Sequence, residues 1–285
     1  MADLGVVAIA ITVAAWAISL TLERRIAIIA GNLRGAVLVL FVGIFPILIF
    51  FLISNFAMSP YAILLSLVSG ILLAIGYILY YKSLETEQVS NTSGIGLAQP
   101  AILLLFSILV LHETISSIQA LGGIIIFVGV LLIITNNKLE LNRKLLPALL
   151  ANVSWAGYWV IASYAILFSQ QVGATLLIAR LTSLVVVLIA FALAMKNHVV
   201  PRLKNSLVPM LLIIGAAAGI LDGLGNATFG YVVQFQLLSI GSIFVASLPL
   251  FVTLLAYIFY KEHLTRLQGI GMIMAVAGAL VVAAF

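Results

Sequence analysis

Ten long apolar segments constrain this chain more than any other feature of its sequence. A helix needs about 20 mostly apolar residues to cross a bilayer, and inside lipid only helices and closed barrels satisfy their own backbone hydrogen bonds. The segments lack the alternation that is typical of barrel strands. The sequence therefore predicts an all-α membrane protein with ten transmembrane helices. The predicted spans are 3–22, 30–53, 60–81, 89–111, 117–136, 147–169, 172–195, 208–231, 237–259 and 267–285.

The composition supports the same fold class. Of the 285 residues, 65% are apolar and only 7% are charged, whereas about a quarter of the residues in a soluble domain are charged. So few polar side chains cannot cover a water-facing surface, which excludes a soluble enzyme and a nucleic-acid-binding protein. The chain has no cysteine, so disulfides, zinc–thiolate sites and thiol nucleophiles are excluded as well.

The distribution of basic residues predicts the orientation in the membrane. The segments that follow odd-numbered spans are basic, whereas those that follow even-numbered spans carry no Lys or Arg. Because basic loops stay in the cytoplasm, the odd-numbered loops are predicted to be cytoplasmic, with both termini outside and the protein integral to the plasma membrane. The basic loop residues are Arg24, Arg25, Lys82, Lys138, Arg143, Lys144, Lys196, Arg202, Lys204, Lys261 and Arg266.

Proline residues mark one helix start and several bends. Ser59 and Pro60 fit the N-cap and the first position of the third helix. Pro46, Pro100 and Pro249 lie inside apolar segments. They predict kinks, which membrane helices tolerate.

The two halves of the chain resemble each other. When the chain is shifted so that Gly70 falls on Gly219, glycines, prolines and polar residues superimpose without a gap as far as Gly278. Trp16 and Trp155 align with a different offset, and Arg34 with Arg180 is a further candidate pair. The superimposed pairs are Gly70 with Gly219, Gly76 with Gly225, Pro100 with Pro249, Glu113 with Glu262, Gln119 with Gln268, Gly122 with Gly271, and Gly129 with Gly278.

This repeat predicts two five-helix units, residues 1–137 and 138–285. Because five is an odd number, the second unit has the opposite orientation in the membrane, and such an inverted repeat is a common architecture of secondary transporters. The two units can exchange conformations, which provides outward-open and inward-open states of similar energy. Channels and passive scaffolds also contain duplicated units, so these alternatives stay open.

Two short motifs at equivalent places carry a specific resemblance. Residues 111–123 read LHETISSIQALGG and residues 260–271 read YKEHLTRLQGIG. Both are similar to the paired signature of the EamA family in the drug/metabolite transporter superfamily, except that His112 and Lys261 stand where that family usually has glycine. The resemblance implies a ten-helix carrier of small organic solutes, often an exporter of amino acids or related metabolites. It also implies a cavity lined mainly by helices 3, 4, 8 and 9, with contributions from helices 1 and 6.

Part of each motif has a structural explanation. Both contain the spacing of a capping box, which stabilises the start of the following helix. Glu113 and Glu262 are predicted to lie near water at opposite faces of the membrane. A structural role and a gating role both fit these positions. The capping pairs are Ser116 with Gln119 and Thr265 with Gln268.

Two charged residues lie in the middle of predicted spans, where a charge is costly and indicates function by default. Arg180 and Asp222 lie at similar depths, about 12 Å and about 13 Å below the outer boundary at 1.5 Å per residue, so we expect an ion pair. A fixed pair would hold two helices together. A breakable pair would release Asp222, the candidate proton site, to a proton or a cationic group, or Arg180 to a carboxylate. Both interpretations stay open.

Matching stripes of polar and aromatic residues occur in both halves. Asp222, Asn226 and Phe229 share one helical face by their spacing. The repeat partner of Asn226 is Tyr77, and that of Phe229 is Tyr80. Two such stripes, related by pseudo-symmetry, would face a shared cavity.

The sixth helix carries a similar face. Asn152, Trp155 and Trp159 lie on one side of it. Trp159 is too deep for the aromatic belt, and an aromatic wall with a few polar groups suits a solute pocket. Trp16, nearer to a charged predicted loop, fits the belt and the cavity equally well, whereas Tyr81, at the end of its helix, is predicted in the belt.

Polar residues also interrupt the fourth and ninth helices. Asn91 and Gln99, and Ser242 in the other half, lie in Gly- and Pro-interrupted segments at corresponding positions, which is a strong sequence indication of a transporter binding site. Close helix packing explains the glycines. It does not explain Asn91 and Gln99, whose amides need hydrogen-bond partners in a dry setting.

Together these features predict a secondary transporter, an exporter by the resemblance, that moves a small metabolite such as an amino acid or related zwitterion by alternating access. A carrier of cationic or lipid-like solutes and a non-transporting membrane scaffold are the alternatives. The expected partners are a small-molecule substrate and membrane lipid, with proton coupling open, no nucleic acid, and a monomeric or homodimeric state. The sequence has no Walker, metalloprotease or nucleophile-elbow motif, so we predict no enzyme activity, cofactor or metal.

Overall fold

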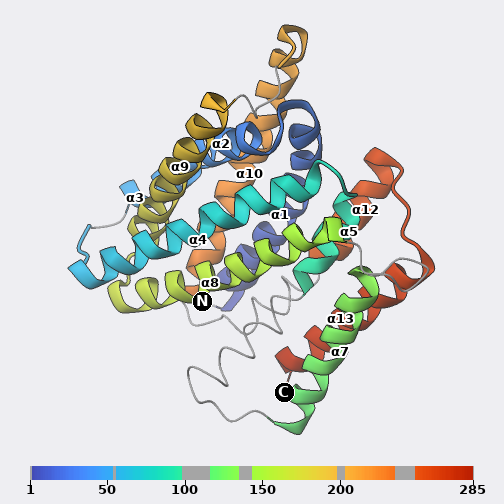
Figure 1. Ribbon diagram of the computed structural model, residues 1–285. Helices are drawn as coiled ribbons and strands as arrows, with labels where there is room; N and C mark the ends of the chain where they lie inside the picture. Colours follow the sequence, from blue (N-terminus) through green and yellow to red (C-terminus); the bar gives the residue numbers. More distant parts are fainter. Residues whose placement is uncertain are drawn as a thin grey trace.

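The computed structural model of the chain consists of helices packed around a common centre (Figure 1). It describes residues 2–53, 56–97, 116–134, 143–197, 203–234 and 248–284. In the first half the helices are α1 (Ala2–Ala30), α2 (Asn32–Val42), α3 (Ile44–Leu52), α4 (Pro60–Leu84), α5 (Val89–Gly94), the 3₁₀ turn η1 (Ile95–Leu97) and α7 (Ser117–Ile134). In the second half they are η2 (Arg143–Leu145), α8 (Leu146–Ser169), α9 (Val172–Lys196), η3 (Asn205–Leu207), α10 (Val208–Gln234), α12 (Leu248–Tyr260) and α13 (Arg266–Ala284).

Within these described ranges, six helical segments are long and apolar enough to cross a membrane. Two shorter apolar helices cover Ala120–Ile133 and Leu248–Tyr260. The predicted spans 89–111 and 237–259 extend beyond the described residues. The chain is therefore an all-helical, multi-pass membrane protein. The six long segments are Val7–Ala30, Asn32–Leu52, Pro60–Leu84, Arg143–Ser169, Val172–Lys196 and Asn205–Gln234.

The first helix is longer than the sequence predicts. The predicted end at residue 22 is wrong, because α1 continues to Ala30 and stops at Gly31, whose φ of 78° lies in the left-handed region that favours glycine. Arg24 and Arg25 therefore lie inside a helix and not in a loop. Arg24 donates to backbone carbonyls at the end of α4, and the side chain of Glu23 is only 1% exposed.

Proline explains the interruption of the second span. Helix α2 ends at Val42 and α3 begins at Ile44, just before Pro46, which lacks an N–H and whose ring meets the carbonyl four residues earlier. This confirms the bend predicted there. Pro249 is the second residue of α12, where proline is well tolerated; the residues before it, and Pro100, lie outside the described ranges.

The third span begins as its sequence predicts. The Ser59 hydroxyl accepts a hydrogen bond of 3.2 Å from the backbone N–H of Ala62, and Pro60 occupies the first turn of α4. Pro60 has no N–H to leave unpaired there. The predicted N-cap is confirmed.

The two halves pack on each other through equivalent contacts between a tryptophan and a glycine. Trp155 of α8 lies against Gly76 of α4, where a methyl group would come within 2.3 Å of the indole ring. Trp16 of α1 lies against Gly225 of α10 in the same way, at 2.6 Å. Helices α4 and α8 lie side by side along much of their length (Figure 1). Each half therefore supplies a tryptophan helix that packs on a glycine helix of the other.

A second pair of glycine contacts fixes the register between the halves. Gly70 of α4 packs on the Ala179 carbonyl in α9, and Gly219 of α10 packs on the Val39 carbonyl in α2. Ala179 is thus the counterpart of Val39, just as Gly219 is the counterpart of Gly70. The segment from Ala179 to Gly219 in the second half is longer than the segment from Val39 to Gly70 in the first.

This register identifies the first-half residues that correspond to Arg180 and Asp222, the two members of the ion pair predicted from the sequence. Arg180 follows Ala179 and corresponds to Leu40, while Asp222 corresponds to Leu73 by the alignment of α4 with α10. The alignment of Arg34 with Arg180 is wrong, because this register places Arg180 opposite Leu40, six residues after Arg34. The ion pair is thus present in one half and replaced by two leucines in the other.

Helices α7 and α13 form a separate pair at one edge of the molecule (Figure 1). A methyl group at Gly129 would come within 2.5 Å of the Gly271 carbonyl, and one at Gly278 within 2.7 Å of the Gly122 carbonyl. Small residues at these crossings let the two backbones approach closely. These two helices lie outside the central group that surrounds the cavity described below.

Candidate functional site

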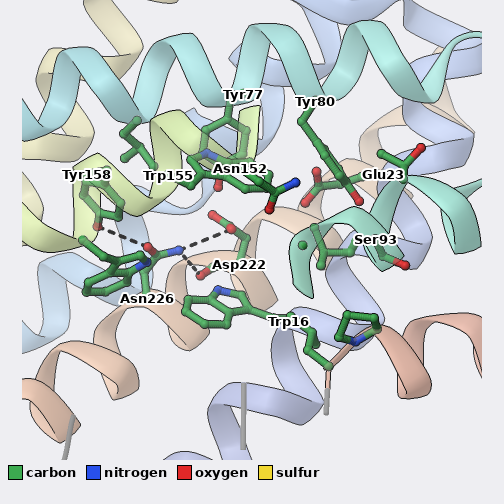
Figure 2. Close-up of a pocket in the computed structure, with 17 residues that line it drawn as sticks. Trp16, Glu23, Tyr77, Tyr80, Ser93, Asn152, Trp155, Tyr158, Asp222 and Asn226 are labelled. Carbon is green, nitrogen blue, oxygen red and sulfur yellow. Dashed lines mark hydrogen bonds between the residues drawn. The ribbon is translucent and has the colours of Figure 1, made fainter. Parts of the chain in front are cut away.

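A cavity lies where the two halves meet (Figure 2). About 90 Å³ of it is open to the centres of water molecules; one water needs about 10–15 Å³ of such space, so the cavity has room for several waters or a small solute. Its wall comes from α1, α4, α5 and η1 and from α8, α10 and α12, which are the helices that the family resemblance implies. The lining residues are Trp16, Leu20, Glu23, Leu73, Tyr77, Tyr80, Thr92, Ser93, Gly96, Asn152, Trp155, Tyr158, Trp159, Asp222, Asn226, Leu248 and Pro249.

The ion pair expected between Arg180 and Asp222 is confirmed, with the two side chains 1% and 7% exposed. Every nitrogen of the guanidinium donates a hydrogen bond. Nε donates to the Leu40 carbonyl at 3.0 Å and Nη2 to the Val39 carbonyl at 3.0 Å, while Nη1 donates to the Tyr77 hydroxyl at 3.1 Å. Arg180 is therefore held by α2, α4 and α10 together, and of this pair it is Asp222 that lines the cavity.

Asn226 extends this network along the cavity wall. Its Nδ2 donates to the Asp222 carbonyl at 2.9 Å and to Asp222 Oδ1 at 3.3 Å. Its Oδ1 accepts from the Tyr158 hydroxyl at 3.3 Å. Figure 2 shows the bonds from Tyr158 through Asn226 to Asp222 as dashed lines. The network fixes the orientation of the Asn226 amide, which faces the cavity.

Aromatic rings from α1, α4 and α8 make up much of the wall. Trp16 and Trp159 meet edge to face with centroids 6.1 Å apart, and Tyr80 and Trp155 are 5.0 Å apart. Phe229 lies behind the first pair, with its ring centroid 4.6 Å from that of Trp159. The predicted aromatic stripes of α4, α8 and α10 therefore converge with Trp16 of α1.

The short helix α5 contributes two aliphatic hydroxyl side chains to the wall. Thr92 and Ser93 line the cavity, whereas Asn91 is buried in the same helix without lining it. Across the cavity, Asn152 donates from Nδ2 to the Ala148 carbonyl at 2.8 Å. The Oδ1 of Asn152 faces Gly96 of η1, where a side chain would come within 3.4 Å of it.

Most of the predicted site residues gather at this cavity. Arg180 and Phe229 contact lining residues from behind, and Gln99 and Ser242 lie outside the described ranges. The placement of Tyr81 in the aromatic belt is wrong, because it is 0% exposed and packs against Tyr77 and Tyr80. The predicted residues that line the cavity are Trp16, Tyr77, Tyr80, Asn152, Trp155, Trp159, Asp222 and Asn226.

Glu23 is a charged lining residue that was not predicted from the sequence. The two arginines that follow it suggest a charged loop, but α1 continues past all three. Its position two helical turns after Trp16 places both on one helical face, and both line the cavity. That spacing is the signal that could have identified it.

Hydrogen bonds between the halves join α5, which lines the cavity, to the segment after α12. Glu262, after α12, accepts hydrogen bonds from the backbone N–H groups of Val89 and Ser90 at 3.2 and 3.0 Å and from the Ser90 hydroxyl at 2.6 Å. It therefore caps the start of α5. Nearby, the Tyr260 hydroxyl donates to the Thr21 carbonyl of α1 at 2.8 Å.

The second motif has the structure expected of its capping box. The Thr265 N–H donates to Oε1 of Gln268 at 3.0 Å, and the Gln268 N–H donates to the Thr265 hydroxyl at 3.3 Å. The capping box at the start of α13 is confirmed. Its counterpart in the first half and Glu113 cannot be compared, because Gln119's side chain and residue 113 are outside the described set.

Membrane-crossing helices that enclose a small polar and aromatic cavity are a feature of the class of solute carriers. The EamA-like transporter family matches residues 3–135 and again residues 142–284, and the chain belongs to this family. It is therefore a multi-pass membrane transporter of small solutes, built from two copies of the family unit.

Comparison with solved structures supports the same fold. One crystal structure superimposes on this chain with a TM-score of 0.70 and 16% sequence identity. The matched region includes 97% of this chain and 95% of the other chain. At this identity the likeness concerns the fold alone. A search of curated proteins finds no match.

Proposed function

We propose that the chain is a secondary transporter that exports a small amino-bearing metabolite, an amino acid or related zwitterion, from the cell. The observation that carries this proposal is the cavity at the junction of the two repeats, lined by aromatic rings and polar groups from both. Such a wall suits a small solute with an apolar body and a few polar groups. A scaffold would instead place Asp222, Asn226 and Trp159 in dry helix contacts.

Alternating access between two inverted five-helix units, residues 1–137 and 138–285, is the proposed mechanism. Two family matches of similar length and the equivalent tryptophan–glycine contacts support it. Because the contacts of one half repeat in the other, exchanging their conformations costs little and exposes the cavity to the other side. The contacts of Glu262 and Tyr260 would close one side in this cycle.

The proposed orientation keeps the basic connecting segments in the cytoplasm and both termini outside, in the plasma membrane. Arg24 and Arg25 no longer count as loop residues. Lys82 and Lys196, in the last turns of α4 and α9, and Lys261 still follow odd-numbered spans. A reporter fused to the carboxyl terminus should remain outside the cytoplasm, and a cytoplasmic signal would contradict this topology.

The transport proposal is tested with purified protein in liposomes. Counterflow is measured with labelled amino acids, amines and neutral metabolites, and empty liposomes serve as the control. We expect saturable counterflow of at least one amino-bearing solute without ATP. No protein-dependent flux for any solute would contradict transport by this protein.

Coupling to a proton at Asp222 is a separate proposal. The ion pair with Arg180 of α9 and the bond from Asn226 hold this carboxylate in place, so release of Asp222 requires its pair with Arg180 to break. Asp222→Asn should remove the stimulation of transport by a pH gradient if Asp222 carries the proton. An unchanged response to the gradient would eliminate that role.

A further inference from the structure

Glu23 is a buried acidic side chain that the interactions of the fold leave incompletely satisfied. It is 1% exposed and lines the cavity. Oε1 accepts a hydrogen bond from the Ser19 hydroxyl at 3.0 Å, whereas Oε2 is buried without a hydrogen-bond partner among the described residues. A buried carboxylate is costly unless it is paired with a cation or well hydrogen-bonded.

The cation that acts electrostatically on Glu23 is already paired with another carboxylate. Both Arg180 and Asp222 interact electrostatically with Glu23, but Arg180 is paired with Asp222 and donates to Val39, Leu40 and Tyr77 as well. It therefore neutralises Asp222, and it is not among the residues that line the cavity. In the part of the chain that the structure describes, no Lys, Arg or His lines the cavity.

The rings around Glu23 suit a positive charge. Trp16 lies on the same face of α1, and Tyr80 and Trp155, whose ring centroids are 5.0 Å apart, line the same cavity. An ammonium group gains from contact with aromatic faces, most of all in a desolvated site. Figure 2 shows Glu23 below Tyr80 at the end of the cavity that Ser93 also lines.

The facing titratable groups come from each helix around Glu23. Helix α4 places Tyr80 and Tyr81 there, both with buried hydroxyls that have no hydrogen-bond partner among the described residues. Helix α10 contributes Asp222 and helix α9 contributes Arg180. The charges of these last two cancel, which leaves Glu23 as the carboxylate without a balancing cation.

We propose that Glu23 binds the protonated amino group of the substrate, so that the recognised class is small primary amines with an apolar body, and that a substrate carboxylate is dispensable. The inference rests on the proposed function, because it assigns a group of the same cavity. The carboxylate pairs with the ammonium, and the faces of Trp16, Tyr80 and Trp155 surround it. Because Arg180 is paired with Asp222 and does not line the cavity, the cavity presents no guanidinium to a substrate carboxylate.

Three matched solutes test this assignment: phenylalanine, phenethylamine, which lacks the carboxylate, and N-acetylphenylalanine, which lacks the basic amine. Binding to the purified full-length protein is measured by titration calorimetry, and counterflow is measured in liposomes. We expect phenethylamine to bind at least as tightly as phenylalanine and N-acetylphenylalanine not to bind. Binding of N-acetylphenylalanine with the affinity of phenethylamine, or binding of none of the three, would overturn the proposal.

The variant Glu23→Gln keeps the shape of the side chain and removes its charge. It should weaken phenethylamine binding at least tenfold, while Glu87→Gln, which removes a carboxylate outside the lining residues, should leave it unchanged. Glu23→Asp, which keeps the charge on a shorter side chain, should retain measurable amine binding, and this controls for misfolding. Wild-type amine affinity in Glu23→Gln would contradict the assignment.

Two further outcomes separate this inference from the proposed function. If Glu23→Gln removes a pH dependence of counterflow but leaves amine affinity intact, Glu23 carries a proton only and the inference fails while transport stands. If the wild type binds phenethylamine through Glu23 but no solute crosses the liposome membrane, the amine site stands and the transport proposal fails.

Discussion

The two halves of the molecule share their packing but not their charges. In both, a tryptophan of the first helix lies on a glycine of the other half's third helix, Trp16 on Gly225 and Trp155 on Gly76. Where the second half has Arg180 and Asp222, however, the first has Leu40 and Leu73. The comparison indicates that the repeated contacts form the framework, and that the polar side of the cavity was added to it unequally.

The asymmetry extends to the first helix of each half. In the alignment that superimposes Trp16 on Trp155, Glu23 corresponds to Ala162, which is 0% exposed. A carboxylate therefore stands in one half and a methyl group in the other. The pseudo-symmetric cavity is therefore chemically polarised, and the proposed amine site predicts that a solute with one charged end binds in a single orientation.

The largest loss of unfolding free energy is expected when only one member of the Arg180–Asp222 pair is replaced by the leucine that the first half has at that position. Asp222→Leu leaves the Arg180 guanidinium buried without its counter-ion, which costs about 3–5 kcal/mol. The double variant Arg180→Leu, Asp222→Leu copies the Leu40 and Leu73 arrangement and should recover most of that stability, because a buried pair is often replaceable by apolar residues. Unfolding of both variants in detergent measures the difference. A double variant as unstable as the single one would contradict the equivalence of the two halves.

A smaller loss of unfolding free energy is expected at the two tryptophan–glycine contacts that the halves share. Gly76→Ala and Gly225→Ala would each press a methyl group against an indole ring, at 2.3 and 2.6 Å, and overpacking of this kind costs about 1–3 kcal/mol. We expect similar losses of unfolding free energy in the two variants and weaker solute binding in both. Gly269→Ala is the matched control, because no neighbouring atom lies within 4 Å of the new methyl group. Loss of stability in only one of the two variants would contradict the structural equivalence of the two contacts.

The smallest loss of unfolding free energy is expected at the contact between Glu262 and the start of α5. Glu262→Ala removes the acceptor for two backbone N–H groups at the start of α5, and loss of a helix cap costs about 1 kcal/mol. Because the chain has no native cysteine, Ser93→Cys provides a single reporter inside the cavity. Its modification by a thiol reagent should become faster when Glu262→Ala is added. An unchanged rate would show that this contact does not close the cavity.

Much of the framework could be predicted from the sequence, because its signals are local. Ser59 and Pro60 define the start of α4, Pro46 defines the bend before α3, and the depths of Arg180 and Asp222 predict their pairing. These features depend on the order of residues along one helix. The internal repeat likewise identifies Gly76 and Gly225 as equivalent positions.

The remaining features depend on contacts that no local pattern encodes. The carboxylate of Glu23 looks exposed in the sequence because two arginines follow it, but Arg24 is bonded to carbonyls at the end of α4 and α1 continues to Gly31. Tyr81 looks interfacial because it lies at a helix end, yet neighbouring helices bury it. In both cases a distant segment covers the residue, and only the packed structure reveals which one.

The central claim is that side chains from both repeats face one cavity that solutes can enter. It is tested by cysteine modification of Ser93→Cys in the first repeat and Asn152→Cys in the second, in lipid nanodiscs, with the cationic 2-aminoethyl methanethiosulfonate. Ile220→Cys, which is 48% exposed on the outer surface of α10, is the control that faces lipid. We predict that both cavity positions react faster than the control and that phenethylamine protects both. If either cavity position reacts no faster than Ile220→Cys, the two repeats do not share an accessible cavity.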